Sequence, residues 1–330
     1  MNVPFGARSE VMNAMTGFVE ESVNKFLMPI ESNWQPSDFL PDASNKEEFF
    51  AQIKEIQGAA EGLSYDLLTV LVGDTITEEA LPTYESWLNR IEGIHEKPET
   101  DPWKTWVRGW TAEENRHGDL LNKYLFLSGR VNMREFETST QFLIADGFDI
   151  ETGQDPYRNF VYTSFQELAT NISHRRVAIL AKKQGDSLLS KICGMVAADE
   201  KRHAFAYSAF IKKIIEFDSS ELLVAFEDMM RKKIVMPAHF LRETGMEVGG
   251  LWGHFTDAAQ RIGVYTAIDY SNILQDLVND WDLEHLPNLN DQGEKARDYL
   301  MKLPGRLNRI AERMTSPTKE YQFKWIGVQG

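Results

Sequence analysis

The sequence predicts an all-α protein built as a bundle of long helices, and three observations lead to this fold class. Apolar residues recur with helical spacing over long stretches from about residue 46 onward. Gly, Pro, Asp and Asn stand at most junctions between these stretches, where helices are capped or stopped. No alternating strand pattern of useful length appears before the tail that begins at Glu320, where a short strand could form.

The first 45 residues differ from the rest of the chain. They predict an N-terminal helix followed by an extended arm, because breakers gather in "MPIESNWQPSDFLP". No composition shift or flexible linker divides the remaining residues, so we expect one domain over 1–330, with a helical bundle over 46–315 and a C-terminal tail over 316–330. The helical patterns of this bundle cover residues 45–74, 77–93, 102–129, 134–147, 157–185, 186–217, 219–241, 254–281 and 291–314.

Composition narrows the possible functions. With 330 residues, 42% of them hydrophobic and 26% charged, the chain can bury a large core. Its apolar runs, such as "LLTVLV" at 67–72, are shorter than the roughly 20 residues of a membrane-spanning helix. The net charge of −15 argues against nucleic acid or an anionic membrane as the main partner. One cysteine, Cys193, and no visible secretory signal predict a cytoplasmic protein.

The phrase Glu-x-x-His carries the first chemical signal. Residues three apart share a helix face, so Glu114 with His117, and Glu200 with His203, can each offer an oxygen and a nitrogen to one point. Both pairs lie in the middle of predicted helices. A third pair, at 92–95, stands where a helix ends and is interpreted as a surface coincidence.

Two further glutamates complete a repeated pattern. Glu167 lies in "FVYTSFQELATNIS", where a charge is unexpected, 33 residues before Glu200. In the first half Glu78 and Glu79 compete for the equivalent role. Glu78 shares a helix face with Leu81 and Tyr84, so Glu78 is the choice. The candidate metal ligands are therefore Glu78, Glu114, His117, Glu167, Glu200 and His203.

Four carboxylates cannot stay ionised in a core unless cations neutralise them. Two divalent metals would balance the charge. Mixed carboxylate and imidazole ligands suit iron or manganese better than zinc or calcium. The alternative is a polar bundle whose acids pair with Arg or Lys at the surface.

Several long stretches resemble one family, the soluble acyl-acyl carrier protein desaturases of the stearoyl type. They are "GDTITEEALPTY", "WTAEENRHGDLLNKYLFLSGRV", "YTSFQELATNISH", "AADEKRHAFAY", "MMRKKIVMPAH" and "QRIGVYTAIDY", and the resemblance runs from about residue 34 to residue 327. It implies a ferritin-like di-iron helical bundle with additional helices, in which the same six residues hold two iron ions. It also implies O2-dependent insertion of a cis double bond into a saturated acyl chain carried on acyl carrier protein. A ferredoxin-like donor would supply the electrons, water would be the by-product, and the protein would be a homodimer.

Other residues receive expectations on this basis. Thr170 could hydrogen-bond or pass a proton near the metals, or bond only its own helix backbone. Asp199 could orient a ligating histidine or be a solvated acid. Trp34 resembles a family residue suggested to lie on the electron route.

Acyl carrier protein is acidic, so basic clusters gain meaning despite the net charge. The expected docking residues are Lys201, Arg202, Arg231, Lys232 and Lys233. Trp87, Ile91 and Ile150 are expected to line the deep end of the acyl pocket, and a bulky Trp87 there predicts a shorter substrate, such as palmitoyl.

The resemblance also bears on location. No plastid transit peptide precedes the arm, which predicts a bacterial protein, or a plastid protein whose transit peptide has been removed. Rival interpretations are an iron store of ferritin-like fold and an interaction scaffold with a vestigial metal site. The membrane desaturases do not fit, because the chain has neither histidine-rich boxes nor membrane helices.

Overall fold

The structure is a computed structural model that describes residues 5–315, 317–318 and 320–327. Within these residues the chain is helical and contains no strand, so the all-α prediction is confirmed. The strand considered for the tail does not form among the residues described there. The tail instead makes one isolated antiparallel bridge, between Val131 and Ile326.

The helices in chain order are α1 (Phe5–Ala14), α2 (Thr16–Phe26), α3 (Lys46–Glu61), α4 (Tyr65–Glu79), α5 (Leu81–Leu88), α6 (Pro102–Ser128), α7 (Met133–Asp146), α8 (Pro156–Lys183), α9 (Ser187–Lys232), α10 (Trp252–Arg261), α11 (Ala267–Asp280) and α12 (Asp291–Ala311). Short 3-10 turns lie at Pro36–Asp38, Pro237–Phe240 and Leu283–His285. None of these helices is both long enough and apolar enough to cross a membrane.

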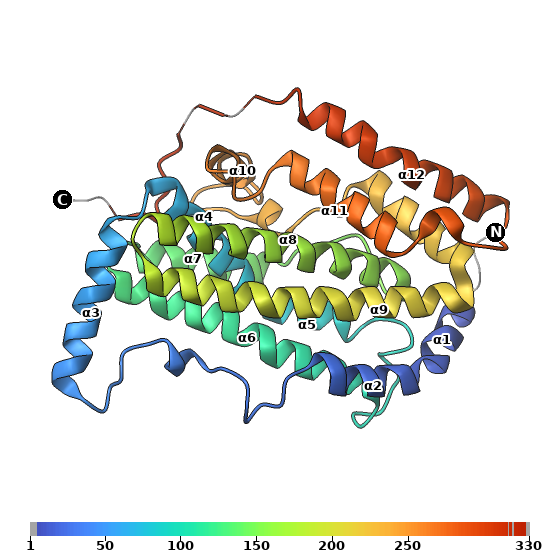
Figure 1. Ribbon diagram of the computed structural model, residues 1–330, viewed down its shortest axis with the longest axis horizontal. Coiled ribbons are helices and arrows are strands. Elements are labelled where there is room, and N and C mark those ends of the chain that lie inside the picture. Colours follow the sequence, from blue (N-terminus) through green and yellow to red (C-terminus); the bar gives the residue numbers. More distant parts are fainter. Residues whose placement is uncertain (1–4, 316, 319, 328–330) are drawn as a thin grey trace.

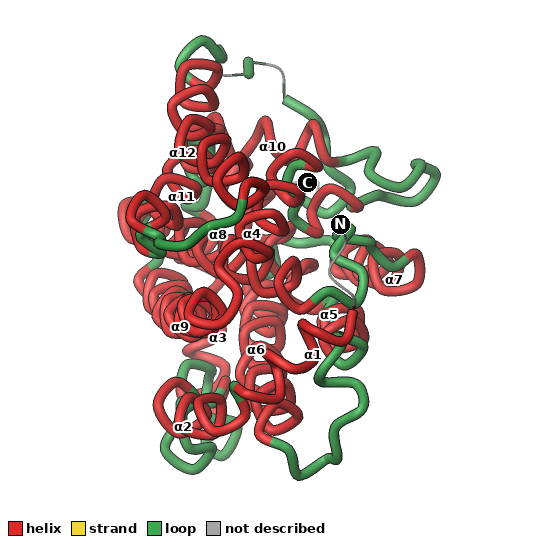
Figure 2. The backbone as a smooth tube through the Cα atoms, turned by 90° about the vertical axis from the view of Figure 1, so that its right-hand side faces the viewer, coloured by secondary structure: helices red, strands yellow, loops and turns green. Residues whose placement is uncertain are grey.

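Three long helices, α6, α8 and α9, run along the long axis of the molecule (Figure 1). The view from the end places α10, α11 and α12 on one side of them and α2 on the other (Figure 2). Each long helix begins with an aspartate that accepts hydrogen bonds from backbone N–H groups of the first turn. These caps are Asp101 for α6, Asp155 for α8 and Asp186 for α9. Proline follows the cap in α6 and α8, where its missing N–H costs nothing.

The helix boundaries differ from the sequence patterns in several places. The 254–281 pattern is two helices, α10 and α11, because α10 ends at Arg261 and Thr266 caps a new start. The 219–241 pattern stays α-helical only as far as Lys232. The 45–74 pattern is two helices, because the chain turns at Gly62 and Ser64 caps a new start. The 77–93 pattern is interrupted at Ala80, so α4 ends at Glu79. The N-terminal segment forms two helices, α1 and α2, rather than one, before the arm. The predicted junction between 186–217 and 219–241 survives as a kink at Asp218, where α9 leaves helical geometry.

Aromatic side chains fill the space between α6 and α9 on one side of the candidate site. Trp106 lies edge-on to Tyr207 and Phe210, with ring centroids 5.7 and 5.0 Å away. Each side chain of this kind contributes roughly 1.5–3 kcal/mol through burial. This packing holds the two helices that carry Glu-x-x-His in a fixed register.

Candidate metal centre

The six predicted ligands come together from four helices. Glu78 lies on the last turn of α4, Glu114 and His117 on α6, Glu167 on α8, and Glu200 and His203 on α9. Their ligand atoms form two overlapping groups, each with all atoms within 4.8 Å of one another. One group contains Glu78, Glu114, His117 and Glu200, the other Glu114, Glu167 and His203. Glu114 belongs to both groups.

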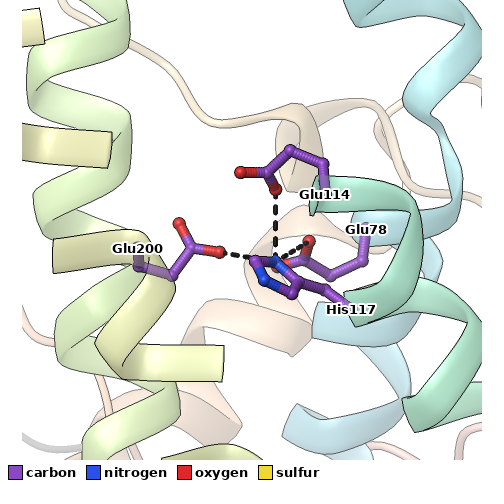
Figure 3. Close-up of side chains that lie close together, drawn as sticks. All are labelled: Glu78, Glu114, His117 and Glu200. Atoms are coloured by element: carbon purple, nitrogen blue, oxygen red, sulfur yellow. Dashed lines mark ion pairs between the residues drawn. The ribbon is translucent and has the colours of Figure 1, made fainter. Parts of the chain in front are cut away.

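In the first group three carboxylates surround one imidazole nitrogen (Figure 3). His117 Nδ1 lies 3.1 Å from Glu200 Oε1, 3.3 Å from Glu114 Oε2 and 3.7 Å from Glu78 Oε2. Glu200 reaches this point from α9, opposite Glu78 and His117. The side chains therefore converge from three helices on one small volume.

The second group places two carboxylates around the other histidine. His203 Nδ1 lies 2.6 Å from Glu114 Oε1 and 3.7 Å from Glu167 Oε2. Both histidines are fully buried. Each histidine turns Nδ1 toward the glutamates of the two ligand groups and Nε2 away from these glutamates.

An acid binds the outer nitrogen of each histidine, and the two acids are exchanged between the halves. Asp199 precedes Glu200, yet its Oδ2 lies 3.4 Å from Nε2 of His117. Glu113 precedes Glu114, yet its Oε2 lies 2.8 Å from Nε2 of His203. Such acids fix the orientation of a ligating histidine. Asp199 is buried, which agrees with the orienting interpretation and not with a solvated acid.

Arg202 joins these two acids. Its guanidinium donates to Asp199 Oδ1 at 2.6 Å, to Glu113 and to the carbonyl oxygen of Phe26. Burial opposes charge on Asp199, but His117 and then Arg202 outweigh it and hold the pKa of that carboxyl below its usual range. The acids therefore stay ionised behind the histidines.

The ligand atoms themselves lack such partners, and this tests whether a metal fits. Glu114 Oε1, His117 Nδ1, Glu200 Oε1 and His203 Nδ1 are buried and have no hydrogen bond to any described residue. Burial, together with the charges of Glu114 and Glu200, raises the pKa of Glu167 well above its ordinary value. A cluster of carboxylates that repel one another, facing imidazole nitrogens that form no hydrogen bond within the part of the chain that the structure describes, fits divalent cations.

Three neighbouring side chains support the glutamates. Trp110 Nε1 donates to Glu167 Oε1 at 3.0 Å. Thr170 Oγ1 lies 2.5 Å from Glu200 Oε2, and also 3.2 and 3.1 Å from the backbone carbonyls of Gln166 and Glu167, so both interpretations of this residue have a contact. His174 Nε2 lies 2.9 Å from Glu78 Oε1.

Sequence reasoning missed several of these supporting residues. The sequence assigns no role to Trp110 and predicts docking for Arg202, because partners that decide their roles lie on other segments of the chain. His174 had a usable signal, since it lies seven residues after Glu167 and four after Thr170, on the same helix face. Glu113 also had one, because it stands before Glu114 as Asp199 stands before Glu200.

An apolar cavity of about 340 Å³ opens beside the cluster. Glu78, Glu114 and Glu200 form part of its inner wall, and Ile310 and Met314 of α12 and the segment after it line it where they are exposed. Between these ends the walls are mainly apolar, drawn from residues such as Leu81, Phe255 and Ala259. The cavity thus connects the surface beside α12 to the ligands.

The residues expected at the deep end of the pocket do not line this cavity. Trp87, Ile91 and Ile150 are buried but absent from its walls. Trp87 instead packs behind Tyr84, which does form part of the wall, with ring centroids 5.2 Å apart. The reason is the break at Ala80, after which α5 carries Trp87 behind the first layer of side chains.

The expected docking residues are also placed differently from one another. Arg202 is directed into the site, where it joins Asp199 and Glu113. Arg231 pairs with Glu227, and Lys232 lies 3.3 Å from Asp228. Lys201 and Lys233 are exposed. These five residues therefore do not form one free basic surface.

The helical bundle and its buried glutamates and histidines define the class: a ferritin-like protein whose four-helix core carries a cluster suited to metal binding. Comparison with known proteins identifies the family within this class. The fatty acid desaturase family model matches residues 7–327, and the chain belongs to this family.

Several relatives are acyl carrier protein desaturases of plants. The chain is 49% identical over 323 residues to stearoyl-[acyl-carrier-protein] 9-desaturase 1, chloroplastic, of Arabidopsis thaliana, covering 96% of this chain and 81% of the relative. It is 48% identical over 322 residues to the stearoyl-[acyl-carrier-protein] 9-desaturase of Ricinus communis, again covering 96% and 81%. Among solved structures, DesA2 of Mycobacterium tuberculosis, described as an acyl-ACP desaturase, shares the fold with a TM-score of 0.53 and 15% identity, covering 84% of this chain and 97% of that chain.

Proposed function

We propose that the protein is a di-iron desaturase that introduces a cis double bond into a saturated acyl chain carried on acyl carrier protein. Per double bond the reaction uses one O2, two electrons and two protons, and releases two waters. The observation that carries the proposal is the apolar cavity that ends on the glutamate–histidine cluster. The family relationship supports the same activity.

The six ligands would hold the two irons, and Glu114 belongs to both groups of ligands. When bound, the irons activate O2 and supply the oxidant that removes hydrogens from two adjacent methylenes, which have no useful acidity of their own. The protein's own residues do the remaining work. The cavity walls exclude water and hold the acyl chain beside the cluster.

The route for electrons is proposed to start at Trp34. Its indole Nε1 donates to Asp199 Oδ2 at 3.0 Å, and its ring lies parallel to that of His117 with centroids 6.0 Å apart. Trp34 is half-buried and stacks under the guanidinium of Arg116. This chain of contacts connects the arm to the ligands, where a ferredoxin-like donor could deliver electrons.

Acyl carrier protein is proposed to dock at the open end of the cavity. Arg306, Arg309 and Arg313 are exposed there and form no ion pair with any residue that the structure describes. Exposed Ile310 and Met314 lie among them. An acidic partner could bind these arginines while its acyl chain enters the cavity. Of the docking residues expected from sequence, Lys201 and Lys233 remain exposed candidates.

An iron store is the rival function, and the cavity argues against it. Hydrated iron needs a polar route, whereas the walls between Ile310 and the cluster are mainly apolar. A homodimer and a bacterial cytoplasmic location stay predictions, as does iron over manganese.

Product analysis tests the proposal. The protein, reconstituted anaerobically with Fe(II), is incubated with C14, C16 and C18 acyl carrier proteins, O2 and reduced ferredoxin. We expect a monounsaturated product and about two irons per chain. Glu114→Gln should abolish both turnover and the second iron, while Lys123→Ala on the surface of α6 should change neither. Absence of product with two irons bound, or stoichiometric zinc in place of iron, would contradict the proposal.

A further inference from the structure

His174 is a buried histidine that contacts Glu78 of the ligand cluster without belonging to either ligand group. Its side chain is 1% exposed. It lies on α8 at positions seven after Glu167 and four after Thr170, so all three side chains leave the same face of the helix. One face of α8 therefore presents a ligand, a hydroxyl group and an imidazole to the site.

The imidazole of His174 contacts only one of the two carboxylate oxygens of Glu78. His174 Nε2 lies 2.9 Å from Oε1, while Oε2 of the same carboxylate lies 3.7 Å from His117 Nδ1 and faces the cluster. A donor on one oxygen fixes the plane of the carboxylate and leaves the other oxygen for a metal.

Glu78 needs such support more than Glu167 does. Glu78 is the second-last residue of α4, which ends at Glu79, and helical geometry is interrupted at Ala80. Glu167 stands in the middle of the 28 residues of α8, with complete helical turns on both sides. The backbone therefore holds Glu167 more rigidly than Glu78.

The two halves of the site repeat the ligands but not the supporting donors. Glu167 receives an indole N–H from Trp110 at 3.0 Å, whereas Glu78 receives an imidazole. Although the acid–Glu-x-x-His phrase is repeated, the glutamates of the two proposed metal positions therefore receive hydrogen bonds from different donors.

We propose that His174 is a positioning residue that holds Glu78, and that the metal position built from Glu78 and His117 depends on it. The inference rests on the proposed function in so far as the cluster binds two metals. Loss of a supporting donor of this kind typically lowers metal affinity by 10–100-fold. The loss should fall on one of the two positions.

Three variants separate positioning from simple packing. His174→Leu removes the donor. His174→Gln places an amide N–H about where Nε2 stands, and His174→Asn carries the same amide but is too short to reach Glu78. Trp110→Phe is the matched control, because it removes the donor to Glu167 in the other half.

The assay is anaerobic titration of the metal-free protein with Fe(II), followed by Mössbauer spectra of the 57Fe-loaded protein. We expect the unchanged protein and His174→Gln to bind two irons. His174→Leu and His174→Asn should keep one iron and bind the second about 10–100-fold more weakly, with loss of one quadrupole doublet. Trp110→Phe should perturb the other doublet.

If His174→Leu binds both irons as tightly as the unchanged protein and gives the same Mössbauer spectrum, the inference is overturned. If His174→Leu does not fold, as judged by circular dichroism, the comparison of Gln with Asn decides, and equal binding by those two would also overturn it. Failure of the unchanged protein to bind two irons would instead refute the proposed function.

Discussion

Replacing Trp87 by methionine should move the substrate preference toward longer acyl chains. Trp87 does not touch the cavity, but it supports Tyr84, which forms part of the wall. Behind it Trp87 contacts Phe148 and Tyr162, with ring centroids 5.8 Å away in both cases. A smaller side chain at position 87 leaves room into which Tyr84 can retreat, so the cavity gains depth at this end.

The expected magnitude follows from burial of methylene groups. Each methylene removed from water contributes about 0.8 kcal/mol. The two additional methylenes of a C18 chain therefore contribute about 1.6 kcal/mol if the new space holds them, which is roughly 15-fold in kcat/KM. The ratio of kcat/KM for C18 over C16 should rise by up to this factor in Trp87→Met.

The variant should remain folded. Trp87 Nε1 is buried and has no hydrogen bond to any described residue, so its removal leaves no partner unsatisfied. Methionine is flexible and fills irregular space. Trp281→Met is the control, because Trp281 is also buried but packs on Phe226, which does not line the cavity, whereas Trp87 packs on the wall residue Tyr84.

The assay is competition between C14, C16 and C18 acyl carrier proteins, with products separated by chain length. The unchanged protein should prefer C16 to C18, as the sequence predicts. A clear preference of the unchanged protein for C18 would refute the shorter-substrate prediction. A C18 to C16 ratio that stays within about twofold in folded Trp87→Met would refute the role of Trp87.

Three further predictions concern charge and metal. Glu167→Gln should bind one iron instead of two and should raise the melting temperature of the metal-free protein at pH 7, because burial makes its charge costly; two retained irons would contradict this. Burial lowers the pKa of His239 to about 4, so the folded state binds fewer protons than the unfolded state as pH falls from about 6.5 to 4. The contribution of His239 to the free energy of unfolding should therefore decrease across that window by about 1–2 kcal/mol after allowance for partial exposure, and urea titrations of His239→Gln should show a total decrease that is smaller by this amount. Replacing Arg306, Arg309 and Arg313 by glutamate should raise the KM for acyl carrier protein at least about tenfold with little change in kcat, and should reduce the salt dependence of this KM. An unchanged KM would place docking elsewhere.

The sequence was sufficient to predict which six side chains come together, because the relevant contacts repeat within helices. Glu-x-x-His spacing placed each glutamate beside its histidine, and helical phase separated Glu78 from Glu79. In the structure Glu79 accepts a hydrogen bond from Asn122 at 2.5 Å, while Glu78 faces the cluster. Glu78, Leu81 and Tyr84 all line the cavity, as a shared face requires, even though the helix is interrupted between them.

The features that the sequence could not predict depend on contacts between distant segments. Arg202 stands beside Glu200 in a basic run, and only the fold shows that the Phe26 carbonyl and Glu113 draw its guanidinium inward. The depth at which Trp87 lies depends on the turn at Ala80, which no helical period contains. The sequence alone does not distinguish a charged side chain at the surface from one directed into the core, because the same residue type serves both roles.

The exchange of orienting acids has a consequence for assembly. If Asp199 oriented His203 of its own helix, α9 could prearrange one metal position alone. Instead Asp199 of α9 orients His117 of α6, and Glu113 of α6 orients His203 of α9, with Arg202 joining the two acids. Neither helix can present an ordered histidine until the other has docked, because each imidazole takes its orientation from across the interface. Metal binding and the packing of α6 against α9 should therefore stabilise each other.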